Sequence, residues 1–560
     1  MIQIINLFFY YFLIIFSAIG YGMLASFNLR KKERIDFGFF GLTGILILIL
    51  FSYLSNLFFV HGYLHNSIII LIGFSIFNFI LIKNFSQLKK NFHITVIVFS
   101  ILFIGLLMYK NHDDFFYYHF QYSLSLINFK KIFGLGLMGH GYRTPSSLFY
   151  LNSLFYLPGI KFYLLNAGAI IIMGFANVIL LNKILEYFKN KNYNFILFLI
   201  SLTFIYINAT FYRLAEHGTD RSSLILIFIF SIIYLESLNV KKKYNIGILE
   251  NYYEKIIILI TLIISFKSFY LIYFLFILIW LFQVKNFWTI KESIKVISSN
   301  KFTYLSFFTV SAVLFSIFSN TGCLIYPASF TCFENFAWSI STETVDYMKA
   351  WYELWSKAGA NPNNRVTDPA LYLQNFNWVG RWFNDYFFTK VSDFLLTITL
   401  ISTIMFFYLR PLQRKLKIKN IIRFKFFYLL IILFTLEWFV NHPALRYGGY
   451  TLFALLLFIP ISIYLSKFEY NFIDLQKKLS VLLVVSLVIF CALNVKRIVK
   501  ENKKYAYNPF TNPYFYIDHN IGFKVDTSLR YIKDNLYQNK NNNYFILNRD
   551  LVSEEKKKNK

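Results

Sequence analysis

The N-terminal part of the chain holds two apolar stretches that a basic cluster separates. Residues 4–27 read IINLFFYYFLIIFSAIGYGMLASF, residues 37–59 read FGFFGLTGILILILFSYLSNLFF, and Arg30-Lys31-Lys32-Glu33-Arg34 lies between them. Each stretch has at least the roughly 20 residues that a helix needs to cross a bilayer core. Lys and Arg are retained mainly in cytoplasmic loops. The pattern therefore predicts two membrane-spanning helices that are joined on the cytoplasmic side and start from an outer N-terminus.

Apolar stretches and short basic loops alternate along most of the chain. Hydrophobic residues make up 57% of the 560 residues and charged residues 15%, against roughly 25% charged residues in soluble domains. The pattern predicts an all-α, polytopic transmembrane helical bundle of about fourteen spans in a bacterial inner (cytoplasmic) membrane. The predicted spans are Ile4–Phe27, Phe37–Phe59, Ile68–Ile82, Ile94–Tyr109, Phe162–Leu181, Phe195–Ile207, Leu224–Leu238, two short crossings within Ile256–Phe282, Tyr304–Phe318, Phe394–Leu409, Phe426–Val440, Leu452–Leu465 and Leu482–Val495.

The run Ile256–Phe282 has basic residues on both flanks and one lysine, Lys267, near its middle. A lysine at the centre of a spanning helix costs about 2.5–3.5 kcal/mol on an insertion scale. Two crossings that turn near Lys267 avoid this cost and leave both basic flanks in the cytoplasm. We therefore predict a hairpin whose tip carries Lys267 to the outer side.

The net charge of +28 resides largely in the loops between spans. It therefore indicates topology, and no nucleic-acid partner is expected. The chain divides into an N-terminal four-helix extension (1–109), a membrane core (110–495) with outer loops 110–159 and 320–393, and a polar tail (496–560). The span count places the tail outside, although five basic residues follow the last span: Lys496, Arg497, Lys500, Lys503 and Lys504.

An acidic pair, Asp113 and Asp114, follows His112 just beyond the fourth predicted span. One carboxylate there can take a proton from a hydroxyl, and two can orient a divalent cation. A solvated loop that marks a helix end is the alternative interpretation. The mixed aromatic and polar segment Phe115–Phe133 predicts a helix lying in the membrane interface.

Histidine and arginine recur in the predicted outer loops, where few arginines are expected. They lie in a glycine-rich turn (134–145), in a short loop (212–221) that also holds Glu216 and Asp220, and in a turn at 441–450. A guanidinium group matches the geometry of phosphate oxygens. The alternatives are a salt bridge between Arg213 and Glu216 and a headgroup anchor at Arg446. The candidate substrate- or phosphate-binding residues are His112, His140, Arg143, Arg213, His217, Arg221, Lys267, His442 and Arg446.

The longest outer loop combines two cysteines with many aromatic residues. Cys323 and Cys332 are close in sequence, and a disulfide is plausible outside the cytoplasm. Aromatic rings interleaved with carboxylates are typical of carbohydrate-binding surfaces, and an aromatic belt at the membrane interface is the alternative. The tryptophans and tyrosine of this group are Trp338, Trp351, Tyr352, Trp355, Trp378 and Trp382.

The layout of residues 109–270 resembles the multispanning glycosyltransferases of the GT-C fold, such as protein mannosyltransferases and lipid A aminoarabinose transferases. These enzymes place an acidic pair in the first large outer loop, followed by a surface helix and a stretch containing His and Pro. The matching residues are Asp113 with Asp114, Phe115–Phe133, and His140 with Pro145. Four spans precede the acidic loop here, where the family has one. The chain is also similar to bacterial membrane proteins associated with surface polysaccharide loci.

The resemblance implies transfer of a sugar from a polyprenyl-phosphate- or polyprenyl-pyrophosphate-linked donor to a glycan or lipid acceptor. It implies that Asp113 or Asp114 deprotonates the acceptor hydroxyl and that Arg143, Arg213, Arg221 or Arg446 holds the leaving phosphate. The expected partners are these substrates and membrane lipids. No cofactor is indicated by a motif, no metal-ligand spacing occurs, and a divalent cation stays an open alternative.

Three other functions fit the same pattern. A surface polysaccharide polymerase or ligase would use similar lipid carriers and outer arginines. A lipid-linked sugar transporter or flippase would place ionisable residues near the bilayer midplane, where the predicted spans are nearly free of charge. A non-catalytic assembly scaffold would not need Asp113 or Asp114.

Overall fold

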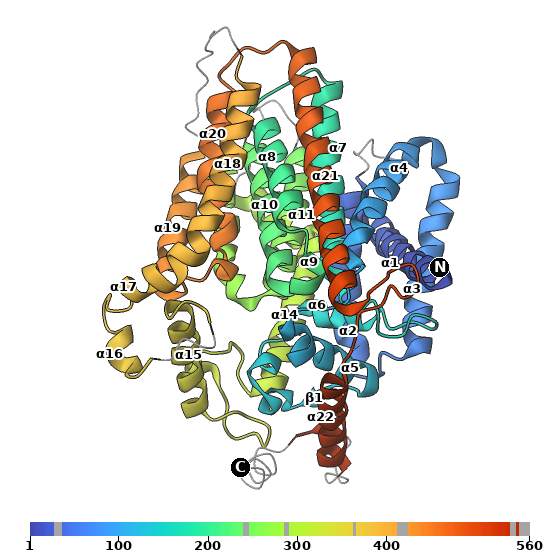
Figure 1. Cartoon of the computed structure of the whole chain (residues 1–560), viewed down its shortest axis with the longest axis vertical. Coiled ribbons are helices and arrows are strands. Elements are labelled where there is room, and N and C mark those ends of the chain that lie inside the picture. Colours follow the sequence, from blue (N-terminus) through green and yellow to red (C-terminus); the bar gives the residue numbers. More distant parts are fainter. Residues whose placement is uncertain are drawn as a thin grey trace.

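The computed structural model describes residues 1–26, 36–238, 246–284, 290–361, 366–411, 424–537 and 545–547. Within these residues the regular structure is helical except for one two-stranded sheet. The predicted basic loops at 30–34 and 241–243 lie outside the described residues. Figure 1 shows long helices packed side by side, with α5 (Phe120–Asn128), α15 (Thr342–Lys357) and α22 (His519–Tyr537) together at one end. This end, made of the described residues of 107–166, 322–391 and 506–547, is called the loop end.

The remaining helices and strands are as follows. They are α1 (Ile2–Ser26), α2 (Phe37–Asn56), α3 (Tyr63–Lys83), α4 (Phe85–Leu102), β1 (Ile132–Phe133), α6 (Ser147–Ser153), α7 (Ala167–Lys189), α8 (Phe195–Thr210), α9 (Leu214–His217), α10 (Thr219–Leu238), α11 (Ile246–Phe266), α12 (Leu275–Val284), α13 (Ile290–Ser299), α14 (Lys301–Thr321), α16 (Pro369–Leu373), α17 (Val379–Trp382), α18 (Ser392–Leu409), α19 (Lys425–Asn441), α20 (Gly449–Leu465), α21 (Phe472–Tyr505) and β2 (Phe545–Ile546).

Among the described residues, nine helices are long and apolar enough to cross a membrane, which indicates a helical membrane protein. They are α1, α2, α3, α4 with its 3-10 extension to Leu106, α7, α10, α14, the continuous run Val379–Leu409, and α21. The predicted spans at 195–207, 256–282 and 452–465 coincide with helices that are shorter or carry more charge. Every predicted span overlaps a helix, whereas the count of about fourteen crossings stays a prediction.

Polar side chains cap the first turn of several of the long helices. The side chains of Asp36, Asn194, Asn300 and Asn471 accept hydrogen bonds from backbone N–H groups at the starts of α2, α8, α14 and α21. Such caps satisfy donors that the first turn of a helix leaves unpaired. The starts of these four helices are therefore encoded locally.

The centre of the bundle is formed by α7, α8 and α10, and α21 packs along α8. In Figure 1, α18, α19 and α20 lie on one side of this centre and α1–α4 on the other. The N-terminal helices are not separate from the core, because α2 packs on α7 and α14 and α4 packs on α7. The described residues of 1–109 thus pack against the rest of the bundle, and their role as an N-terminal extension of the core stays a prediction.

Several boundaries differ from those expected from the sequence, and three of them matter for the loop end. α7 starts at Ala167 rather than Phe162, because residues 162–166 form turns and the rings of Phe162 and Tyr163 pack against the tail residue Phe515. The segment Phe115–Phe133 is helical only to Asn128, and its last two residues form β1. α21 continues to Tyr505, ten residues beyond the predicted end at Val495.

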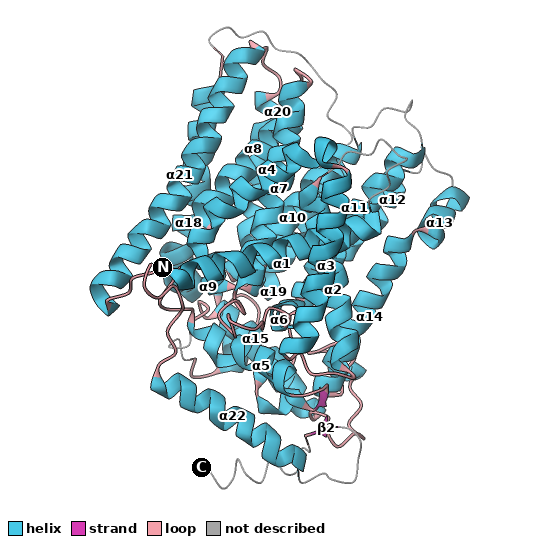
Figure 2. Cartoon of the chain, turned by 90° about the vertical axis from the view of Figure 1, so that its right-hand side faces the viewer, coloured by secondary structure: helices cyan, strands magenta, loops and turns pink. Residues whose placement is uncertain are grey.

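The described tail residues that follow α21, 506–537 and 545–547, lie at the loop end. β1 pairs in parallel with β2, and the backbone N–H of Tyr516 donates to the carbonyl of Tyr109 over 2.8 Å. Figure 2, turned by 90° from Figure 1, shows α22 and β2 at the same end as α5 and α15. The N-terminal ammonium of Met1 also donates to the carbonyl of Phe510. The tail, the N-terminus and the acidic loop therefore share one end of the bundle.

Close contact between α1 and α2 leads to the first prediction. A Cβ added at Gly44 would lie 1.7 Å from the carbonyl oxygen of Ala18, so the two backbones could not keep their separation. We expect Gly44→Ala to lower the free energy of unfolding by about 1–3 kcal/mol, as overpacking does in well-packed cores. Thermal unfolding in detergent measures this, with Gly247→Ala as the control, since a Cβ there meets nothing within 4 Å. Equal melting temperatures for the two variants would contradict the predicted packing.

Candidate functional site

Four charged side chains from four separate segments meet where the loop end borders the helices. The carboxylate of Asp220 accepts from the Lys267 ammonium at 2.5 Å and from the Arg446 guanidinium at 2.8 Å. A second guanidinium nitrogen of Arg446 lies 3.9 Å from a carboxylate oxygen of Asp114. Asp220 is 9% exposed and Asp114 is 36% exposed. These four residues, Asp114, Asp220, Lys267 and Arg446, are called the central cluster. Its buried side is at Asp220 and its solvent-accessible side is at Asp114.

Local structure explains why these residues converge. Asp220 lies in the first turn of α10, where a carboxylate interacts favourably with the helix dipole. α11 ends at Phe266, and Lys267 follows in extended conformation before a 3-10 helix at Ser268–Phe274. Lys267 therefore lies at a break between helical segments, as the sequence suggests, and it points to Asp220.

Arg446 lies in a short 3-10 turn (Leu445–Tyr447) between α19 and α20. Three hydrogen bonds hold this turn: Trp382 and Trp438 donate to its preceding carbonyls at Pro443 and Ala444, and the hydroxyl of Tyr386 accepts from the backbone of Leu445. Gly448, at φ 112°, then allows the chain to enter α20 directly. The turn is thus fixed before Arg446 reaches the central cluster.

The surroundings of Arg446 keep its guanidinium charged. Burial opposes the charge, but Asp220, Tyr447, Tyr118 and Asp114 together hold the pKa of Arg446 above its ordinary value. The guanidinium also lies 5.6 Å from the ring of Trp355 and 5.8 Å from that of Tyr447, within the range of cation–π attraction. Arg446 therefore keeps its positive charge, and its guanidinium packs near the rings of Trp355 and Tyr447.

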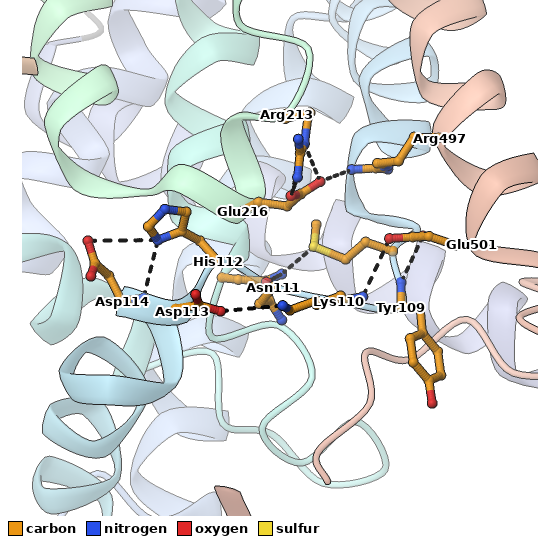
Figure 3. A network of polar contacts seen from close by, with 12 residues as sticks. Tyr109, Lys110, Asn111, His112, Asp113, Asp114, Arg213, Glu216, Arg497 and Glu501 are labelled. Carbon is orange, nitrogen blue, oxygen red and sulfur yellow. Dashed lines mark hydrogen bonds and ion pairs between the residues drawn. The ribbon is translucent and has the colours of Figure 1, made fainter. Parts of the chain in front are cut away.

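The two adjacent carboxylates face different surroundings (Figure 3). Asp113 is 89% exposed and lies 3.5 Å from the Lys110 ammonium. Asp114 points away from this pair, and its oxygen lies 3.7 Å from Nδ1 of His112. The backbone N–H of Asp114 also donates to that nitrogen at 3.2 Å. Of the predicted acidic pair, only Asp114 belongs to the central cluster.

Arg143 and His140 lie beside the aromatic face of α15. The guanidinium of Arg143 donates to the hydroxyl of Tyr326 at 2.9 Å, and Tyr326 is hydrogen-bonded to Tyr352 on α15. The ring of His140 lies 5.7 Å from that of Trp351, and burial together with Arg143 lowers the pKa of His140. No carboxylate lies within salt-bridge distance of Arg143 among the described residues. Its charge is therefore available to an anion.

A second network holds the segment that carries the acidic pair (Figure 3). The carboxylate of Glu216 on α9 pairs with Arg213 and, at 2.8 Å, with Arg497 on α21. Arg497 also donates to the carbonyl of Leu107, and Glu501 accepts from the backbone N–H of Tyr109. This anchor network therefore fastens residues 107–109 to α9 and α21. The guanidinium of Arg213 belongs to the anchor network through its salt bridge with Glu216. This salt bridge is the predicted alternative to phosphate binding by Arg213.

The other candidate residues lie apart from the central cluster. Arg221 packs between the rings of Phe211 and Tyr450, at 5.7 and 5.9 Å. The ring of His442 lies 5.7 Å from that of Tyr447, and burial lowers the pKa of His442. Cys323 and Cys332 form a disulfide in the loop that carries Tyr326. The side chain of His217 lies outside the described part of the structure.

The sequence pattern assigns no ligand role to Asp220, Arg497 or Glu501. Asp220 lies in the loop 212–221, and Arg497 and Glu501 belong to the basic stretch after the last predicted span. The presence of Arg497 outside the predicted cytoplasmic loops was the one available signal. Across the described residues no group of three or more His, Cys, Asp or Glu side chains is arranged to hold a metal ion.

The anchor network predicts a loss of stability when its carboxylate is removed. Glu216 is 1% exposed and Arg497 is 9% exposed, so Glu216→Gln leaves a buried guanidinium without its counter-charge. We expect a fall of about 3–5 kcal/mol in the free energy of unfolding. Thermal or denaturant unfolding in detergent measures it, with Asp474→Asn as the matched control. Asp474 is 60% exposed in its pair with Lys478, and such exposed pairs contribute about 0–1 kcal/mol. Similar losses for both variants would refute the role of the network.

A histidine beside the central cluster predicts a pH dependence. Burial lowers the pKa of His119 to about 3, with Asp220 opposing and Arg446 and Lys267 reinforcing this shift, whereas an unfolded histidine titrates near ~6.5. Because the folded pKa is the lower one, the contribution to stability is full above pH ~6.5 and falls as pH decreases toward 3.

We expect His119→Gln to remove a slope of up to about 1.4 kcal/mol per pH unit below pH ~6.5. Unfolding at a series of pH values from 7 to 4.5 measures this slope relative to the unmodified protein. His93→Gln, at an exposed position, serves as the control. An unchanged slope in His119→Gln would show that His119 is protonated in the folded protein.

Comparison with known proteins places the chain in one family. No curated protein and no solved structure matches it. The model of a family described as a domain of unknown function, DUF8201, matches residues 1–453. This range contains all four residues of the central cluster but not Arg497, Glu501 or the tail. Because it covers more than half of the chain, the protein belongs to the DUF8201 family.

Proposed function

We propose that this protein is a membrane glycosyltransferase that uses a polyprenyl-phosphate- or polyprenyl-pyrophosphate-linked sugar as donor. The proposal rests on one observation: the accessible carboxylate of Asp114 lies 3.9 Å from the guanidinium of Arg446, beside aromatic side chains. Glycosyl transfer to a hydroxyl needs a base for the acceptor and cations for the leaving phosphate. Both kinds of group are within one small region of the loop end.

Asp114 is the base in this proposal. It accepts the proton of the acceptor hydroxyl while the acceptor oxygen bonds to the anomeric carbon. The bond from that carbon to the phosphate oxygen breaks, and its electron pair leaves with the phosphate, so the anomeric centre is inverted. Asp113 is a poor candidate, because it is 89% exposed and faces Lys110.

Arg143 is the favoured cation for the leaving phosphate. Arg446 and Lys267 already share the carboxylate of Asp220, so much of their charge is compensated. Arg143 interacts with a tyrosine hydroxyl and a backbone carbonyl instead. An arginine cannot lose its proton at physiological pH, so an anion is the natural complement of this position. Arg446 then orients Asp114 and adds to the positive field.

The face of α15 with Trp351, Tyr352 and Trp355 suits the sugar. Trp351 lies beside His140, and Trp355 lies beside Arg446, so the aromatic face joins the two charged positions. Aromatic rings pack against the apolar C–H faces of sugars, and the charged groups at either end bind hydroxyls or phosphate. In the proposed topology this surface opens on the outer side of a bacterial inner membrane, where a polyprenyl tail can lie between helices.

Replacing the proposed base tests the function. We expect Asp114→Asn to lower the rate of sugar transfer about 10²–10⁴-fold, whereas Asp113→Asn keeps most of the activity. The assay uses purified protein in vesicles with polyprenyl-phosphate- and polyprenyl-pyrophosphate-linked sugars, and mass spectrometry detects the covalent product. Arg143→Gln should also slow transfer, and Arg143→Lys should restore part of it.

The same assay separates the alternative functions. A single added sugar supports the proposed transfer, and a ladder of products indicates a polymerase instead. Movement of the lipid-linked sugar across the vesicle without covalent product indicates a flippase. Full activity in Asp114→Asn would eliminate the proposed mechanism.

A further inference from the structure

The acidic loop is covered by a part of the chain that lies far away in sequence. Residues 506–518, called the strap, run from the end of α21 to the start of α22 across residues 109–120. Tyr109 is stacked between Tyr505 and Tyr516, with ring centroids 4.6 and 5.0 Å away. The backbone N–H of Tyr516 also donates a hydrogen bond to the carbonyl of Tyr109, which adds to the stacking of the rings. The strap thus fixes the point where the chain leaves α4 and turns toward Asp114.

Phe515 is the central contact of the strap. Its ring is 5% exposed and lies 5.6 Å from Phe115 and 5.8 Å from Phe116, the two residues that follow Asp114. It also contacts Phe120 at 6.3 Å, at the start of α5. Truncation of a buried aromatic ring of this kind to Ala removes these contacts and leaves a cavity that the neighbouring rings fill only in part. Phe515 therefore packs against the start of the helical segment that follows Asp114.

The far end of the same loop region is also bound to the tail. β2 pairs with β1, and the backbone N–H of Leu547 donates to the carbonyl of Phe133 over 2.9 Å. Leu547 is fully buried. Asp114 thus lies between two attachments to the tail, at the start of a helical run that continues through Phe115–His119 to the end of α5 at Asn128. The anchor network holds residues 107–109, and the strap adds the contacts that Tyr109, Phe115 and Phe116 make on either side of Asp114.

We propose that Phe515 and Tyr516 are positioning residues that set the place of Asp114 relative to Arg446. The inference rests on the proposed function only for its effect on catalysis, because the placement of the loop can be measured without substrate. A catalytic group has to be held to within about 0.5 Å of its working geometry. The tail is therefore a part of the site, although it touches no reacting atom.

Hydrogen–deuterium exchange of the full-length protein in detergent tests the positioning directly. We expect Phe515→Ala to increase exchange in peptides covering 109–120 while peptides from α7, α8 and α10 stay unchanged. Phe515→Leu, which keeps an apolar side chain, should restore most of the protection. Phe523→Ala on α22, where the ring is 67% exposed, is the matched control and should leave exchange in 109–120 unchanged. Tyr516→Ala, at a half-exposed ring, is a milder variant in case Phe515→Ala does not fold.

The catalytic consequence has its own measurement. Phe515→Ala should lower kcat at least tenfold with little change in KM, and adding it to Asp114→Asn should cause no further loss. Unchanged exchange in 109–120 for both Phe515→Ala and Tyr516→Ala would overturn the inference, and so would increased exchange throughout the bundle. If the protein transfers no sugar, the exchange result still decides the role of the strap. If exchange rises in 109–120 but kcat is unaffected, the strap does not position a catalytic group and the inference fails.

Discussion

The arrangement of the loop end depends on the pairing of charges that the fold buries. Asp220 is almost fully covered, and a buried carboxylate is tolerated only when cations and hydrogen bonds compensate for lost hydration. Lys267 and Arg446 supply that compensation from the end of α11 and from the turn before α20. Three helix ends are thereby held at one point. The accessible edge of this point is where Asp114 meets Arg446.

A second set of ion pairs fixes the position of residues 107–109, from which the acidic loop starts. Glu216 pairs with Arg497, which in turn binds the carbonyl of Leu107, and Glu501 binds the backbone at Tyr109. The two networks are built on neighbouring segments, because α9 and the start of α10 supply Glu216 and Asp220. One short loop therefore determines both where the acidic segment leaves the bundle and where the opposing cations lie. This coupling favours a single geometry for the site.

Much of the fold could be predicted because hydrophobic length is a property of the sequence alone. Every predicted span overlaps a helix, and the break at Lys267 follows from the cost of placing a lysine in the bilayer. Cys323 and Cys332 were close enough in sequence to suggest their disulfide. Boundaries at the loop end were less accurate: tail contacts with Phe162 and pairing of β1 with β2 replace helical structure there. Such contacts leave no periodic pattern in the sequence.

Local composition alone shows which segments are apolar enough to form membrane helices and which loops carry His, Asp and Arg. It did not determine the partner of each charge. The folded structure pairs Arg446 with Asp220 and turns Asp114 rather than Asp113 toward the central cluster. It also selects the predicted salt bridge between Arg213 and Glu216 over phosphate binding by Arg213. The physical reason is that ion pairing acts through space over a few ångströms, between helix ends whose proximity arises from packing the whole bundle.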